Sequence, residues 1–172
     1  MEVAIVLFAA SPAWAWQEFI YLDQGFAIQF PTTTKPTVAT APYASGLAKG
    51  LRANTYSAED DHVIYRMTVV DLGALADKGS SFVNEAAYNL MREGDVIFND
   101  FPRVYQDDKA VYGVTLVVDR PSGERVRTSI YYNKGRLYLA QADVTPARGD
   151  KDMIVPSRFD QTVRFPPDGR FD

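Results

Sequence analysis

The sequence predicts an α+β domain in which a central, mostly antiparallel β-sheet is flanked by helices. Two observations carry this prediction. Segments with the two-residue alternation of half-buried strands outnumber segments with helical periodicity, and short turns join most neighbouring strands. Strands joined by tight turns pair in antiparallel fashion, and the few helices are expected to pack against the resulting sheet.

The first half of the chain contains two predicted strand pairs. The segment FAIQF alternates large apolar side chains with smaller or polar ones, which is typical of a half-buried strand. The Thr- and Pro-rich residues 31–42 are interpreted as an extended loop. The predicted strands of this half are residues 19–22, 26–30, 51–57 and 63–70.

The second half contains two predicted helices and a three-stranded meander. Apolar residues recur at helical spacing over residues 81–93, where Ser80 or Ser81 is the expected N-cap and Gly94 the expected left-handed stop. Residues 96–143 read as the meander, with a glycine of positive φ expected in the turn at Gly135. A short final helix is expected at about residues 152–161, because Pro156 is tolerated only in a first turn.

The first 15 residues have the pattern of a secretory signal peptide. Residues 3–10 (VAIVLFAA) are an apolar run, and Ala13 and Ala15 are the small residues that precede a cleavage site. A transmembrane helix needs about 20 apolar residues, more than this run or any other run in the chain supplies. The usual basic start is absent, so a first buried strand or a misplaced start codon remains as an alternative. We expect residues 1–15 to be the signal peptide, with cleavage after Ala15 left open.

Composition limits the classes of function. The remaining residues 16–172 fit one domain, expected in the periplasm or outside the cell. The chain has no cysteine, which excludes disulfides, thiol chemistry and cysteine-ligated zinc. The formal net charge of −4 and the absence of a basic cluster disfavour nucleic acid and anionic lipid as partners. We predict no cofactor, and the oligomeric state is left open.

Several short motifs together resemble the PsbP-like family, including its bacterial relatives of unknown function. They are GFAIQFP at residues 25–31 followed by Pro36, the helix at residues 81–93 after two strands, GRLY at residues 135–138, and Arg158-Phe159 followed by VRF at residues 163–165. The pattern extends over most of residues 19–165. The resemblance implies an α/β/α sandwich around an antiparallel sheet, and a non-catalytic accessory protein that docks on a larger assembly. It transfers no functional residue to this chain.

The densest group of potential metal ligands is Glu59, Asp60, Asp61 and His62. Carboxylate oxygens bind hard cations, and an imidazole adds affinity for a transition metal. The same residues are also common in solvated turns between strands. We treat them as weak metal candidates, because neighbouring residues in an extended turn point in different directions.

Catalytic motifs are missing from the sequence. His62 is the only histidine, and no G-x-S-x-G nucleophile elbow accompanies it. The carboxylate pairs Asp107/Asp108 and Asp95/Asp100 suggest glycoside hydrolysis only if the members face each other across a cleft. The tripeptide at residues 148–150 (RGD) has the form of an integrin-binding motif but is common by chance. The sequence therefore favours a protein that is not an enzyme.

Tyrosines are concentrated in the meander, which gives the candidate partner-binding residues. Tyr131 and Tyr138 fall on the face opposite Ile130 and Leu137, and Arg127 shares that face. Cross-strand aromatic pairs stabilise sheets, so these residues have a structural interpretation. If no helix covers the face, they form an aromatic wall for a partner, with Arg127 as a polar anchor.

Three hypotheses for the function follow. The first is an exported bacterial envelope protein without catalytic activity that binds another protein through a sheet face or an edge strand. The second is a carrier of a small ligand or metal in a pocket of several hundred cubic ångströms between sheet and helix. The third, a hydrolase, requires a titratable residue with a strongly shifted pKa in a cleft.

Overall fold

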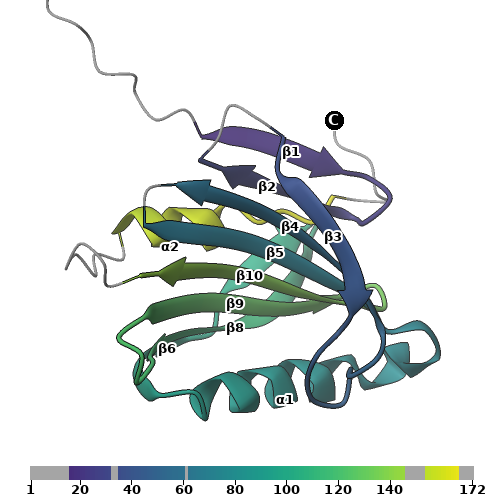
Figure 1. Ribbon diagram of the computed structural model, residues 1–172. Coiled ribbons are helices and arrows are strands. Elements are labelled where there is room, and N and C mark those ends of the chain that lie inside the picture. The colour runs from purple at the N-terminus through teal and green to yellow at the C-terminus, as the bar shows by residue number, and fades with distance from the viewer. Residues whose placement is uncertain (1–15, 32–34, 61, 146–153, 167–172) are drawn as a thin grey trace, which may run out of the picture.

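A computed structural model describes residues 16–31, 35–60, 62–145 and 154–166. Strands dominate this part of the chain (Figure 1). The strands are β1 (Gln17–Tyr21), β2 (Phe26–Phe30), β3 (Thr37–Pro42), β4 (Arg52–Asp60), β5 (Val63–Asp71), β6 (Asp95–Asp100), β7 (Arg103–Gln106), β8 (Lys109–Asp119), β9 (Arg125–Asn133) and β10 (Arg136–Val144). The helices are the 3₁₀ helix η1 (Gly73–Lys78), α1 (Gly79–Met91) and α2 (Ile154–Gln161).

The main sheet is antiparallel in every strand pair described. Its order is β3-β4-β5-β10-β9-β8-β6, and β7 pairs with the first residues of β8. Strand β10 lies between β5 and β9, with Tyr138 opposite Val69 on one side and Tyr131 on the other. The β9–β10 turn confirms the predicted glycine, because Lys134 and Gly135 both have positive φ.

Two apolar cores lie on opposite faces of this sheet. On the α1 face, α1 packs Phe82, Val83 and Leu90 against aliphatic residues such as Leu116 and Ile130. On the other face, called here the β1–β2 face, the core is rich in aromatic residues. It is covered by the β1–β2 hairpin, by α2 and by the closing segment 162–166, which joins β2 through the bridge between Ala27 and Arg164.

The predicted architecture of helices flanking the sheet in an α/β/α sandwich is wrong. The described chain is mostly antiparallel β structure, and α2 is a helix of only eight residues. A hairpin takes much of the place of the second helical layer. The physical reason is that β2 carries Phe26, Ile28 and Phe30, all fully buried, so a strand pair covers the face as well as an amphipathic helix would.

Local corrections concern three predicted elements. The segment at residues 37–42 is not a loop but the edge strand β3, paired with β4. The expected serine caps are absent, because α1 continues directly from η1 and begins at Gly79 with no side-chain cap. Strand β4 extends through Glu59 and Asp60, which the sequence had placed in a turn.

Candidate functional site

A well-formed depression among the described residues is a groove of about 660 Å³. It lies where the β7–β8 hairpin passes the first turns of α1 and the end of β9. We call it the aromatic groove. Its lining is mainly apolar, with Val83 from α1, Phe101 after β6, Tyr112 and Val114 from β8 and Tyr132 from β9, and the two lysines Lys109 and Lys134 are its charged members.

The wall formed by Tyr132 is held rigidly. Its hydroxyl donates a hydrogen bond to the carbonyl oxygen of Ala76 at 2.5 Å. Its ring lies against Gly79, where a Cβ atom would overlap the ring carbons. Glycine at the first position of α1 therefore lets the helix approach the end of β9 and defines one side of the groove.

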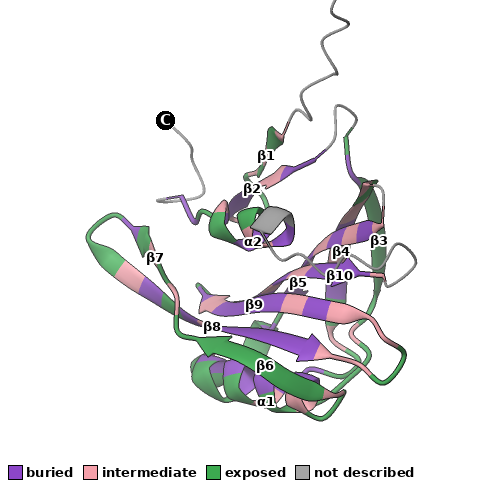
Figure 2. Cartoon of the chain, turned by 90° about the vertical axis from the view of Figure 1, so that its left-hand side faces the viewer, coloured by how far each residue is buried: buried purple, intermediate pink, exposed green. Residues whose placement is uncertain are grey.

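The opposite wall is exposed to solvent. Phe101 and Tyr112 are 69% and 66% exposed, and the guanidinium of Arg103 lies 5.7 Å from the centre of the Tyr112 ring. Figure 2 shows the β7–β8 hairpin projecting beyond the rest of the sheet with a largely exposed tip. Contiguous exposed apolar surface of this kind marks interaction sites in soluble proteins.

The hairpin that carries this wall is anchored at its base by Gly113 and next to its turn by Gln106. The amide of Gly113 donates to the carbonyl of Pro102 at 3.0 Å, and the Gln106 side chain donates to the carbonyl of Pro166. A Cβ at Gly113 would lie 2.5 Å from the ring of Tyr131. The exposed aromatic residues are thus presented by a fixed element.

Strand β6 leads directly into the groove through Phe101. It is the last strand of the path and is exposed along its length (Figure 2). The consecutive apolar residues Val96, Ile97 and Phe98 are 42%, 48% and 44% exposed. A register shift between Val96 and Phe98 leaves Ile97 without a partner in β8, as in a β-bulge.

The structure does not place Tyr131 and Tyr138 on an open surface, so the predicted aromatic wall at these residues is wrong. They are 2% and 1% exposed, and the Phe165 ring lies 5.6 Å and 4.8 Å from their rings. The Tyr138 hydroxyl donates to the carbonyl of Gln24 at 2.9 Å. Burial, followed by the charge of Asp160, raises the pKa of Tyr131 to about 12.

Arg127 is likewise engaged inside the protein. Its Nε and Nη2 donate to the two carboxylate oxygens of Asp160 in α2, at 2.7 and 3.0 Å. Ser129 donates to the same carboxylate at 2.6 Å. This bidentate ion pair joins α2 to β9, and the guanidinium also lies 5.6 Å from the ring centre of Phe98.

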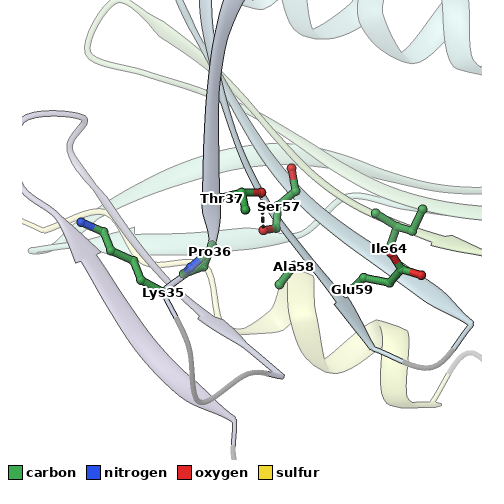
Figure 3. Close-up of a pocket in the computed structure, with 7 residues that line it drawn as sticks. All are labelled: Lys35, Pro36, Thr37, Ser57, Ala58, Glu59 and Ile64. Carbon is green, nitrogen blue, oxygen red and sulfur yellow. Dashed lines mark hydrogen bonds between the residues drawn. The ribbon is translucent and has the colours of Figure 1, made fainter.

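The candidate metal ligands are not gathered into a site in the described residues. Glu59 lines a shallow pocket of about 320 Å³ between the starts of β3 and β5 and the end of β4, and it is the one carboxylate in that lining. Figure 3 shows Glu59 and Lys35 at opposite ends of this pocket. The backbone carbonyl of His62 accepts a hydrogen bond from the Thr145 amide at 2.9 Å. Asp61 lies outside the described residues.

Groups of three or more histidines or carboxylates with metal-site geometry are also absent elsewhere in the described ranges. The paired carboxylates do not face each other. Asp95 and Asp100 are the two ends of β6, about 16 Å apart at the usual rise per strand residue. Asp107 and Asp108 occupy the β7–β8 turn. The signal-peptide segment and the RGD tripeptide lie outside the described residues.

The aromatic groove was missed from the sequence, although two signals for it were present. Tyr112 alternates with Val114 and Leu116, so the pattern places it correctly on the α1 face. The pattern does not show that β8 extends beyond the N-terminal end of α1, and this extension leaves Tyr112 uncovered. The spacing of Phe98, Phe101 and Tyr105 was a second signal, because it matches neither the strand nor the helix periodicity of residues that share one buried face.

Comparison with known proteins supports the fold alone. The chain is similar to the solution structure of cyanobacterial PsbP (CyanoP) from Synechocystis sp. PCC 6803, with a TM-score of 0.51 and 12% identity over 92% of this chain and 98% of that one. This likeness confirms the predicted PsbP-like resemblance as a loose match. Neither a family model nor a curated protein matches the sequence. Within the described ranges, every helix is too short or too polar to cross a membrane.

Proposed function

We propose that this protein is a non-catalytic accessory domain of the bacterial envelope that binds another protein at the aromatic groove. The observation that carries the proposal is the exposure of Phe101, Tyr105 and Tyr112 beside a concave apolar surface. Aromatic anchors seated in or beside pockets dominate the energetics of protein interfaces. The described lining of the groove contains no carboxylate and no imidazole, the side chains that serve most often as general acid or base.

The energetics support an interface. Fully burying one large apolar side chain contributes roughly 1.5–3 kcal/mol, so covering Phe101 and Tyr112 supplies a substantial part of the free energy of a micromolar complex. The rigid backbone reduces the entropy cost of association, because the anchored hairpin orders little on binding. Lys109 and Lys134 add charge at the rim.

Photo-crosslinking tests this proposal. A benzoylphenylalanine introduced at Tyr112 should give one discrete crosslinked product in cells of the source organism. The matched control is Tyr88 on α1, which is 60% exposed and outside the groove lining. The product should disappear when Phe101→Ser is added. A product of equal yield from Tyr88, or one insensitive to Phe101→Ser, would contradict the proposal.

We also propose export, on the basis of the first 15 residues and the absence of cysteine. Trp16, which follows Ala15, packs against the domain core, because its ring lies 5.5 Å from that of the core residue Tyr65. N-terminal sequencing of the mature protein, purified from a periplasmic fraction, should start at Trp16. A mature chain that starts at Met1 and is recovered from the cytoplasm would contradict this part of the proposal.

A small-ligand carrier is the second candidate function, and the volume of the aromatic groove favours it. About 660 Å³ with mainly apolar lining is within the range of small-molecule sites. Thermal-shift screening against metals and apolar metabolites separates the two functions. A ligand that stabilises the wild-type chain but not the Phe101→Ser variant supports a carrier, and the absence of any shift leaves the protein interface as the better account.

A further inference from the structure

The two edges of the sheet are built differently. Strand β3 is preceded by Pro36 and ends at Pro42, and its residues between are threonine, valine and alanine. Proline has no amide to donate, so an edge bounded by proline is protected against pairing with another chain. Strand β6 contains no proline and no lysine, and three consecutive apolar side chains are exposed along it.

The exposed edge of β6 is a template for strand addition, and its bulge at Ile97 and its terminal aspartates restrict the segments that it can accept. Its outward backbone amides and carbonyls form hydrogen bonds with an extended segment, and its side chains select the sequence of that segment. The apolar residues of β6 lie on both faces of the sheet, because Val96 is opposite Val118 and Phe98 opposite Val117. An added strand would therefore place alternate apolar side chains beside both residues.

The charges on β6 indicate which kind of segment would pair with this strand. Asp95 and Asp100 occupy the two ends of β6. Asp119 of β8, which lies opposite Asp95, is itself paired with Arg125. The Arg127 guanidinium, which lies 5.6 Å from the ring centre of Phe98, is paired with Asp160. If two copies of β6 paired antiparallel about their centre, Asp95 would face Asp100 of the other copy at both ends. Like charges directly opposite each other destabilise a strand pair, so the edge disfavours a second copy.

We infer that β6 accepts a short extended segment of the partner protein as an added strand, with apolar residues in its middle and lysine or arginine at its ends. The bulge at Ile97 interrupts the regular ladder, which limits the length of the added strand. The inference rests on the proposed protein-binding function and specifies the partner's chemistry. Phe101 follows β6 directly, so the added strand would end beside the aromatic groove.

Two labelled peptides test the inference on the full mature chain. The first is Lys-Arg-Val-Thr-Ile-Thr-Val-Lys-Arg, and the second replaces its four basic residues with aspartate and glutamate. Fluorescence polarisation should show that the basic peptide binds about tenfold or more tightly than the acidic one. Amide hydrogen exchange should show protection on binding at residues 95–100 and none at residues 37–42.

Charge reversal provides the variant and its control. The double variant Asp95→Lys/Asp100→Lys should lose or invert the peptide preference. The control Asp23→Lys/Asp77→Lys makes the same change of net charge at two other exposed positions and should keep it. Equal affinity for both peptides, protection at β3 instead of β6, or no binding of the basic peptide below about 1 mM would each overturn the inference.

The outcomes separate this inference from the proposed function. If the Tyr112 crosslink forms normally in Asp95→Lys/Asp100→Lys and the peptides do not discriminate, the groove interface stands and strand addition at β6 is wrong. If the basic peptide protects β6 while Tyr112 gives no product, the edge binds as inferred and the groove is not the interface.

Discussion

The two faces of the sheet differ in how completely they are covered. On the β1–β2 face, a hairpin, a short helix and the closing segment bury an aromatic core in which Phe26, Phe30 and Phe159 are fully inaccessible. On the α1 face, α1, η1 and the loop after β3 cover the aliphatic core, but the β7–β8 hairpin extends beyond the N-terminal end of α1 and the aromatic groove remains open.

This contrast separates the aromatic residues that stabilise the fold from those that are available for binding. Aromatic residues of the closed face are held by several neighbours, as when Phe159 lies 5.0 Å from Phe30 and 5.2 Å from Tyr65. Phe101 and Tyr112 have no such cover. Stability is thus expected to depend on the closed face and binding on the open groove.

The largest expected effect comes from truncating the same residue type on the two faces. Phe159→Ala should lower the free energy of unfolding by about 3–5 kcal/mol, because it leaves a cavity in the aromatic core. The matched change Phe101→Ala should alter it by about 0.5 kcal/mol or less. Urea denaturation measures both, and similar losses for the two variants would remove the distinction between the faces.

A second effect concerns the ion pair beneath α2. Asp160→Ala should cost about 3 kcal/mol, because it leaves the buried Arg127 guanidinium and the Ser129 hydroxyl without their acceptor. The more exposed pair near the end of α1 is the control, and Glu93→Ala, which leaves Arg120 with Glu124 as an ion-pair partner, should cost less than about 1 kcal/mol. The double variant Arg127→Met/Asp160→Leu should recover much of the loss, and failure to do so would show that the pair is not the cause.

Alkaline pH gives a third, smaller effect. Burial raises the pKa of Tyr131 to about 12, whereas the unfolded value is 10.0. Between these values the unfolded chain releases a proton that the folded chain keeps, so stability is complete below pH 10.0 and falls as pH rises towards 12. The raised pKa of Tyr131 contributes on the order of 2 kcal/mol to the free energy of unfolding below pH 10.0. Tyr131→Phe should flatten the decline seen by denaturation, and an unchanged slope would contradict the assignment.

Periodicity was sufficient for the elements that bury one regular face. Strand β2, helix α1 and strand β8 were predicted near their observed positions, because their apolar residues recur at the spacing of the structure they form. Strand β3 was missed, since every one of its residues is exposed and an edge strand of threonine and alanine has no buried period.

The sites were harder to predict than the elements, because they depend on what covers each face. The alternation correctly separated Tyr131 from Ile130, but no local pattern indicates that Phe165 and the β1–β2 hairpin cover Tyr131. Similarly, Tyr112 shares the alternation of Val114. Tyr112 is exposed because it lies beyond the N-terminal end of α1, which the alternation does not indicate. The spacing of residues along one strand does not indicate which other elements pack over that strand.

The most direct test of the central claim uses a crosslinker at Tyr105, which is 65% exposed on the β7–β8 hairpin and outside the groove lining. The measurement is the yield of the partner crosslink in the double variant Phe101→Ser/Tyr112→Ser, relative to the yield from the same crosslinker in a chain with the wild-type groove. We expect the yield to fall to background while the free energy of unfolding stays within about 1 kcal/mol of the wild-type value. An unchanged yield in the folded variant would contradict this expectation.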